Sequence, residues 1–287
     1  MTVAEIFASE LMRHIVFRAV LVGVLVSLSS SLLGVSLVTR HYSMIGDGLS
    51  HVGYFALALG AAAGVGTGAR TAIALPIVIC AAILILRLER SGRISGDSAC
   101  AIVATGSVAI GTIIFGISGT NTSDICSSLF GSSSVVTVTA RDAVCAVVLA
   151  AVVCGAVFVG RRLVFAVTFD EQFAAAAGCR VGTLRTALAI LTAVTIVVGM
   201  KMMGAIMISA LIVFPAMTAM QLARSFRSVL ITSAAVSVIS FIIGFILACR
   251  YSLQTGAAVV TCELAVFVIS VAVSRVRCRI GRKRAAS

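Results

Sequence analysis

The stretch Ile15–Val38 reads IVFRAVLVGVLVSLSSSLLGVSLV and carries a single charged residue, Arg18. A helix needs roughly 20 consecutive apolar residues to cross a bilayer, and this run reaches that length. It is too long for the apolar core of an export signal, and it lacks a clear small-x-small cleavage site. The stretch therefore predicts a first membrane span rather than a cleaved leader.

The whole chain has the composition of a membrane domain. Of its 287 residues, 60% are hydrophobic and 11% are charged. A soluble domain carries roughly 25% charged residues, so too few charges are present to cover a water-facing surface. We predict one membrane domain over residues 1–287. The nine cysteines include no C-x-x-C pair and are expected to pack as small hydrophobes.

Similar apolar runs recur along the chain and predict an all-α, multi-pass bundle of eight or nine transmembrane helices. We place nine spans at residues 15–38, 44–63, 71–88, 98–117, 140–160, 185–200, 203–222, 228–249 and 255–274. The break between the sixth and seventh spans, near Met200–Met202, is the weakest. One long bent helix or a re-entrant hairpin is the alternative there.

The basic residues favour one orientation of this bundle. With the C-terminus in the cytoplasm, 16 of the 22 Lys and Arg residues fall in inner segments and 6 in outer ones. Because short cytoplasmic loops carry an excess of positive charge, we predict an outer N-terminus and an inner C-terminus. The same distribution accounts for the net charge of +12 through contact with anionic lipid, so no nucleic-acid partner is expected.

Two ionisable side chains lie four residues apart in the second predicted span. Asp47 and His51 would share one face of a helix, one turn from each other. Such residues inside a span usually mark an ion path or a paired site, and carboxylate plus imidazole suits first-row divalent metals. Two copies around a two-fold axis would supply four ligands. The structural alternative is that Asp47 caps its helix and His51 bonds a neighbour.

Three further features of the sequence each allow two interpretations. Glu263, in the last predicted span, is expected either to pair structurally or to face a translocation path. Pro215 removes a backbone hydrogen bond, so it should kink or break its helix and lie in the protein interior.

In the segment 168–178, Asp170 is a good N-cap and Gly178 a good terminator. They predict a helix of about two turns, which needs a packing partner in this chain or another.

No G-x-x-x-x-G-K-[ST] phosphate loop occurs, and neither does a compact catalytic constellation such as H-E-x-x-H. We therefore expect that the chain does not bind ATP in the usual way and is not itself an enzyme.

Three stretches resemble the membrane subunits of ABC importers for zinc, manganese and iron. Arg40–Val52, RHYSMIGDGLSHV, is similar to their R-x-x-S-x-x-G-D-A-L-S-H-A motif. Phe169–Gly178 resembles their F-D-x-x-x-A-x-x-x-G loop, and Gly204–Arg224 their G-x-x-x-x-x-A-L-x-x-x-P-A-x-x-A stretch. The regions 96–99 and 131–132 fit more loosely. Gly48 stands for the usual alanine, and Gly96 and Gln172 each stand for a glutamate, which leaves the partner contacts of those two loops open.

The resemblance implies a type II ABC importer-like permease. It implies a second permease chain, identical or paralogous, two ATP-binding subunits, and an extracytoplasmic protein that delivers metal. Asp47 and His51 match the metal-coordinating pair of the family. The loop that would couple to the ATPase includes Phe169, Asp170, Glu171, Gln172 and Gly178. No permanently bound cofactor is expected, because the metal is cargo.

Together these features predict the membrane-spanning permease of an ATP-driven importer of zinc, manganese or ferrous iron, in the cytoplasmic membrane. Access would alternate along a dimer interface. A permease of similar architecture for a siderophore or vitamin is one alternative, and it would need no metal ligands. A gradient-driven carrier is another, with Glu263 or Asp47 as its proton carrier. Asp plus His does not select among the three metals.

Overall fold

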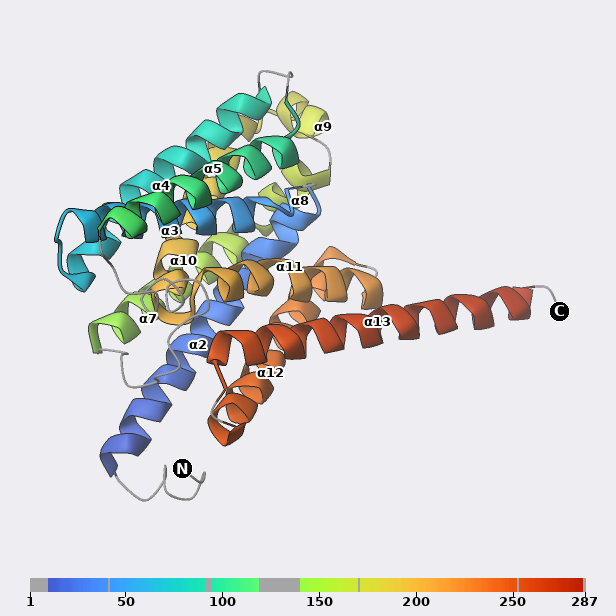
Figure 1. Ribbon diagram of the computed structural model, residues 1–287. Coiled ribbons are helices and arrows are strands. Elements are labelled where there is room, and N and C mark those ends of the chain that lie inside the picture. Colours follow the sequence, from blue (N-terminus) through green and yellow to red (C-terminus); the bar gives the residue numbers. More distant parts are fainter. Residues whose placement is uncertain are drawn as a thin grey trace.

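The computed structural model describes residues 10–40, 42–90, 94–118, 140–169, 171–223, 225–251 and 253–285. In this part of the chain every regular element is a helix, and eight helices are long and apolar enough to cross a membrane. Figure 1 shows them gathered in one bundle from which the C-terminal helix projects. The predicted all-α, multi-pass architecture is therefore confirmed, whereas the side on which each terminus lies stays a prediction.

The long helices follow the predicted spans. They are α2 (Glu10–Val38), α3 (Ile45–Ala62), α4 (Thr67–Arg90), α5 (Gly96–Ile117), α7 (Ala140–Val159), α10 (Val181–Met203), α11 (Ala205–Leu222), α12 (Phe226–Tyr251) and α13 (Thr255–Ala285). All of them except α3 are among the eight apolar spans. The 18 residues of α3 include Asp47, His51 and four glycines, which lower its hydropathy.

Gly204 separates α10 from α11. Its φ of +88° lies in the region that glycine adopts without the steric penalty of a Cβ atom. The N–H of Gly204 still bonds to the carbonyl of Met200 at 2.9 Å, and Gly204 is the single residue between the end of α10 and the start of α11. The two segments are therefore separate helices, and the alternative of one long bent helix is wrong.

Helix α11 lies at the centre of the bundle. It packs against α2, α3, α12 and α13, and Ile208, Leu211 and Ile212 along it are fully buried. Pro215 is also buried, as predicted. The helix nevertheless continues through Pro215 without ending there, so the proline does not break it. Packing on four sides holds the segment helical although one backbone hydrogen bond is missing.

Two short helices, α8 (Arg161–Phe169) and α9 (Glu171–Ala176), connect α7 to α10. Helix α9 lies within the helix predicted near 169–178, whereas α8 falls in a predicted break. Gly178 follows with φ +82°, a conformation common where helices end. Asp170 lies outside the described residues, and so do the side chains of Phe169, Glu171 and Gln172.

Candidate functional site

The first turn of α3 holds Asp47. The helix begins at Ile45, whose N–H donates to the carbonyl of Tyr42 at 3.2 Å, and its N-cap residue, Met44, makes no side-chain capping bond. Asp47 is thus the third residue of the helix rather than its cap, where the helix dipole favours a negative charge. The alternative in which Asp47 serves as the cap is not what the structure shows.

The Asp47 and His51 side chains meet on one face of α3. Their closest atoms, Oδ1 of Asp47 and Nε2 of His51, are 3.5 Å apart. This separation exceeds the usual hydrogen-bond range of about 2.7–3.2 Å. Two ligands of one tetrahedral zinc ion, each with a bond of about 2.0–2.2 Å, lie about 3.3–3.5 Å from each other. The two atoms therefore have the spacing that one shared ion requires.

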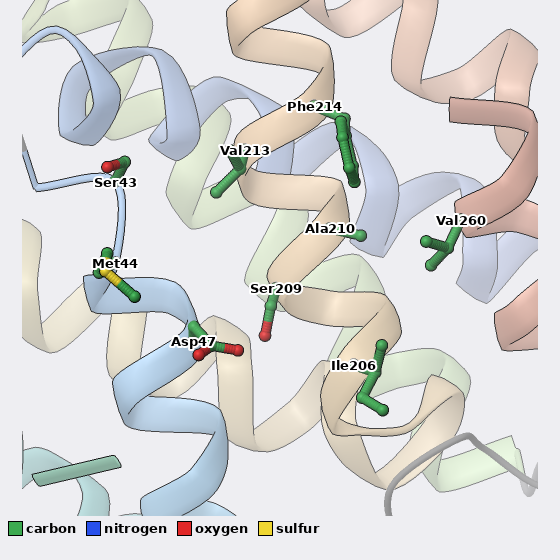
Figure 2. Close-up of a pocket in the computed structure, with 9 residues that line it drawn as sticks. All are labelled: Ser43, Met44, Asp47, Ile206, Ser209, Ala210, Val213, Phe214 and Val260. Atoms are coloured by element: carbon green, nitrogen blue, oxygen red, sulfur yellow. The ribbon is translucent and has the colours of Figure 1, made fainter. Parts of the chain in front are cut away.

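Two serines join α3 to α11 beside this pair. The hydroxyl oxygens of Ser50 and Ser209 are 3.0 Å apart in the buried interior, and the Ser50 hydroxyl also donates to the Asp47 carbonyl at 2.8 Å. Figure 2 shows the Asp47 carboxylate and the Ser209 hydroxyl pointing toward each other. Ser209 is therefore a polar neighbour of the carboxylate in the pocket wall.

Asp47 lines an open pocket of about 350 Å³ between α3, α11 and α13 (Figure 2). Its other lining residues are mostly apolar: Ser43, Met44, Ile206, Ser209, Ala210, Val213, Phe214 and Val260. The Asp47 side chain is 43% exposed. An acidic side chain within a span costs on the order of 3 kcal/mol in lipid, so this face suits protein or water rather than hydrocarbon.

The described part of the chain holds no complete metal-binding group. Among the described residues, no three His, Cys, Asp or Glu side chains come together as a metal-binding group. A tightly held zinc takes four ligands, and Asp47 and His51 provide two. The remaining nitrogen of His51, Nδ1, is buried and has no hydrogen-bond partner in the described part of the chain. If the pair binds an ion, further ligands have to come from outside the described residues, for example from water or another chain.

The other predicted path residues lie outside the pocket lining. Glu263 is buried in α13, one helical turn beyond the pocket-lining Val260. Pro215 follows the pocket-lining Phe214 in sequence but belongs to the buried face of α11. The segment from α9 to Gly178 contributes nothing to the lining.

A cluster of three side chains holds the start of α3. Arg185 of α10 pairs with Glu89 of α4, donates to the Tyr42 hydroxyl, and places its guanidinium carbon 5.3 Å from the centre of the Tyr42 ring. Because the Tyr42 carbonyl accepts the first N–H of α3, the cluster fixes where that helix begins. No pattern in the sequence predicted this cluster. The one relevant feature of the sequence is that Glu89 and Arg185, which carry opposite charges, lie at the ends of two spans on the predicted inner side.

Gly96, at the start of α5, leaves room for this cluster. A Cβ atom at position 96 would lie 2.8 Å from the Tyr42 ring and 3.7 Å from the Glu89 carboxyl carbon. We expect Gly96→Ala to lower the unfolding temperature of the purified protein, because overpacking of this kind typically costs about 1–3 kcal/mol. Thermal unfolding in detergent measures the effect.

Gly106→Ala is the matched control for this prediction. Gly106 lies in the same helix, and a Cβ there would meet no atom within 4 Å. Alanine is favoured over glycine inside helices by about 1 kcal/mol, so this variant should be at least as stable as the wild type. Equal unfolding temperatures for the two variants would contradict the close packing of Tyr42 on Gly96.

Arg40, in the connection between α2 and α3, contacts the helix that precedes α9. Its Nη2 donates to the carbonyl of Val167 in α8 at 2.6 Å, across 127 residues of sequence. Val167 is fully buried, and α9 begins two residues after α8 ends. A displacement of α8 would therefore pull on the α2–α3 connection through this hydrogen bond.

Known proteins share both the sequence pattern and the fold. Residues 12–274 match the ABC 3 transport family. The chain is 31% identical over 269 residues to the "Probable iron transport system membrane protein" of Haemophilus influenzae, covering 91% of this chain and 94% of that one. It is 30% identical over 260 residues to the high-affinity zinc uptake system membrane protein ZnuB of the same organism, covering 90% and 97%.

A manganese transport system membrane protein, MntC of Listeria monocytogenes, is 27% identical over 255 residues and covers 88% of each chain. Among solved structures, PsaBC from Streptococcus pneumoniae in complex with Fab superposes with a TM-score of 0.78 at 23% identity, covering 93% of each chain. The structural match supports the fold, and the sequence matches support the family.

Proposed function

The chain belongs to the ABC 3 transport family, and on that premise we propose that it is the membrane-spanning permease of an ATP-driven importer for zinc, manganese or ferrous iron. The single observation that carries this proposal is the Asp47–His51 pair, whose closest atoms have the spacing of two ligands of one ion. The names of the relatives, which refer to iron, zinc and manganese transport, support a divalent metal as cargo. The whole of residues 1–287 forms one permease domain in the cytoplasmic membrane.

The complete cargo site lies between two permease chains, identical or paralogous. Asp47 is partly exposed beside an open pocket, and each chain contributes one carboxylate and one imidazole. A two-fold axis next to this face doubles the ligands to four, which suits a tetrahedral ion. Burial of Asp47 between chains also removes the cost of a carboxylate facing lipid.

ATP hydrolysis takes place on separate ATP-binding subunits, which dock on the segment from α9 to Gly178. Phe173 in α9 is 68% exposed, and an exposed aromatic ring on a short helix suits contact with a soluble partner. Arg40 joins the preceding helix α8 to the α2–α3 connection through its bond to Val167. Motion of the ATPase pair is thereby passed to the helix that carries Asp47 and His51.

Metal enters from an extracytoplasmic binding protein and is held briefly by these side chains. Asp47 supplies negative charge and His51 a neutral nitrogen, while the hydroxyl of Ser209 points toward the carboxylate (Figure 2). A site for transported cargo must release its ion, so a site shared between two movable chains suits transport better than a rigid one-chain cage. Closure and opening of the ATPase pair then alternate access to the site.

Uptake into proteoliposomes tests the proposal. The chain is reconstituted with its ATP-binding subunit and binding protein, and entry of labelled zinc, manganese and ferrous iron is followed with and without ATP. ATP-dependent uptake of one metal supports the proposal and identifies the cargo. Uptake that does not depend on ATP would indicate a gradient-driven carrier. ATP-dependent transport of a siderophore or vitamin, with no transport of free metal, would indicate a permease for that class of solute.

A further inference from the structure

Glu263 is a second acidic residue deep in the membrane domain. Its side chain is 1% exposed, and neither carboxylate oxygen has a hydrogen-bond partner among the described residues. A buried charge without a partner is very costly, and ionisable groups inside membrane spans are functional candidates by default. The Glu263 carboxyl therefore needs a partner that balances its charge.

The helices packed against α13 supply no counter-charge. Those helices are α11 and α12. The sequence of α11 contains no Asp, Glu, Lys, Arg, His, Cys or Tyr at all. The titratable groups of α12 stand only near its two ends: Arg227, Cys249, Arg250 and Tyr251. On α13 itself the nearest is the thiol of Cys262, which offers no positive charge. A cation that balances Glu263 must therefore come from outside these helices.

The packing places Glu263 at the depth of the cargo pocket. Helices α11 and α13 pack side by side, and the rings of Phe214 and Phe267 are 6.0 Å apart, so position 214 of one helix is level with position 267 of the other. One turn earlier on each helix, Glu263 is level with Ala210, which lines the pocket next to Ser209.

The contact of α13 with α12 gives the same level. Gly244 lies against the backbone of Val259 where these two helices pack in opposite directions. Ser240 stands one turn before that glycine and Glu263 one turn after that valine, so the two are level. The hydroxyl of Ser240 is also buried and has no partner in the described chain.

We propose that Glu263 forms a second, acidic binding site for the transported divalent cation, separate from the Asp47–His51 pair. In this structure Ala210, Phe214 and Val260 separate it from the pocket. This inference rests on the proposed transport function. Carboxylate and hydroxyl oxygens, such as those of Glu263 and Ser240, suit divalent ions such as manganese. A small separation of α13 from α11 would open the pocket wall toward them. A buried carboxylate is too costly to leave without either a cation or a proton.

The first test compares Glu263→Gln with Ser270→Ala in the reconstituted complex. Glutamine keeps the size of the side chain but cannot carry the negative charge, and Ser270 is a second buried polar residue of α13. Ser270→Ala should transport like the wild type. For Glu263→Gln we expect the initial rate of ATP-driven uptake to fall about 10- to 100-fold, the range found when groups that support a metal are lost. Wild-type rates in Glu263→Gln would overturn the proposal.

The second test uses the purified wild-type protein and does not depend on transport. Dicyclohexylcarbodiimide adds to a protonated buried carboxyl to give a stable N-acylurea, with no group lost, and peptide mass spectrometry reports the adduct at Glu263. Zinc or manganese chloride should suppress this adduct, and Glu263→Gln should abolish it. Labelling of Glu263 that saturating metal leaves unchanged would overturn the proposal. If wild-type uptake itself failed, the proposed function would fall, while the labelling would still decide the role of Glu263.

Discussion

Replacement of both Asp47 and His51 by alanine is expected to reduce metal uptake to the level seen without ATP. The double variant removes both proposed ligands of this site, and no third His, Cys, Asp or Glu among the described residues joins them in a metal-binding group. Loss of groups that only support a metal ligand costs about 10- to 100-fold, so loss of the ligands themselves should exceed about 100-fold. Initial rates of labelled zinc and manganese uptake into proteoliposomes measure the effect.

Single variants separate charge from shape at this site. Asp47→Asn keeps the size of the side chain and removes its charge, and it should lose nearly as much uptake as Asp47→Ala. Met44→Leu is the control, because Met44 lines the same pocket and leucine conserves its volume. It should transport like the wild type. Full transport by the double alanine variant would show that the pair is not the cargo site.

The helices could be predicted because apolar length is a local property of the sequence. The predicted span 71–88 lies within α4, and the predicted span 255–274 lies within α13, which continues to Ala285. Hydropathy finds the part of a helix that fits in the bilayer, and not the point where its backbone hydrogen bonds end. Arg and Lys are good helix formers, so α13 continues through its basic end. Helix α8 was missed because nine residues are too few to give a span signal.

The candidate site was only partly predictable, because only its local contacts follow from the sequence. Asp47 and His51 are four residues apart, so their proximity follows from helix geometry alone. Ser50 and Ser209 are 159 residues apart, and no periodicity in either segment indicates that they meet. Of the two outcomes predicted at Pro215, a kink or a break, the break does not occur, because α11 packs against α2, α3, α12 and α13 and this packing is not visible in the sequence. The isolation of Glu263 likewise became clear only once its neighbours were known.

Arg40→Ala is expected to uncouple ATP hydrolysis from metal uptake. The bond from Arg40 to the Val167 carbonyl joins the α2–α3 connection to α8, and a hydrogen bond from a charged donor contributes about 1.5–3 kcal/mol. If that free energy couples the ATPase to the site, its loss should lower the metal moved per ATP hydrolysed by about 10- to 150-fold. Both rates are measured on one reconstituted complex, and hydrolysis itself should persist.

The matched control for Arg40→Ala is Arg70→Ala. Arg70 makes the same kind of bond, from Nε to the carbonyl of Val65 at 2.7 Å, but that bond is local and does not reach α8. Both variants lose one arginine and one charged donor to a backbone carbonyl, so a general loss of stability would affect them alike. Only Arg40→Ala should change the ratio of uptake to hydrolysis. A normal ratio in Arg40→Ala would mean that coupling reaches α3 by another route, of which the Arg185 cluster at Tyr42 is the next to test.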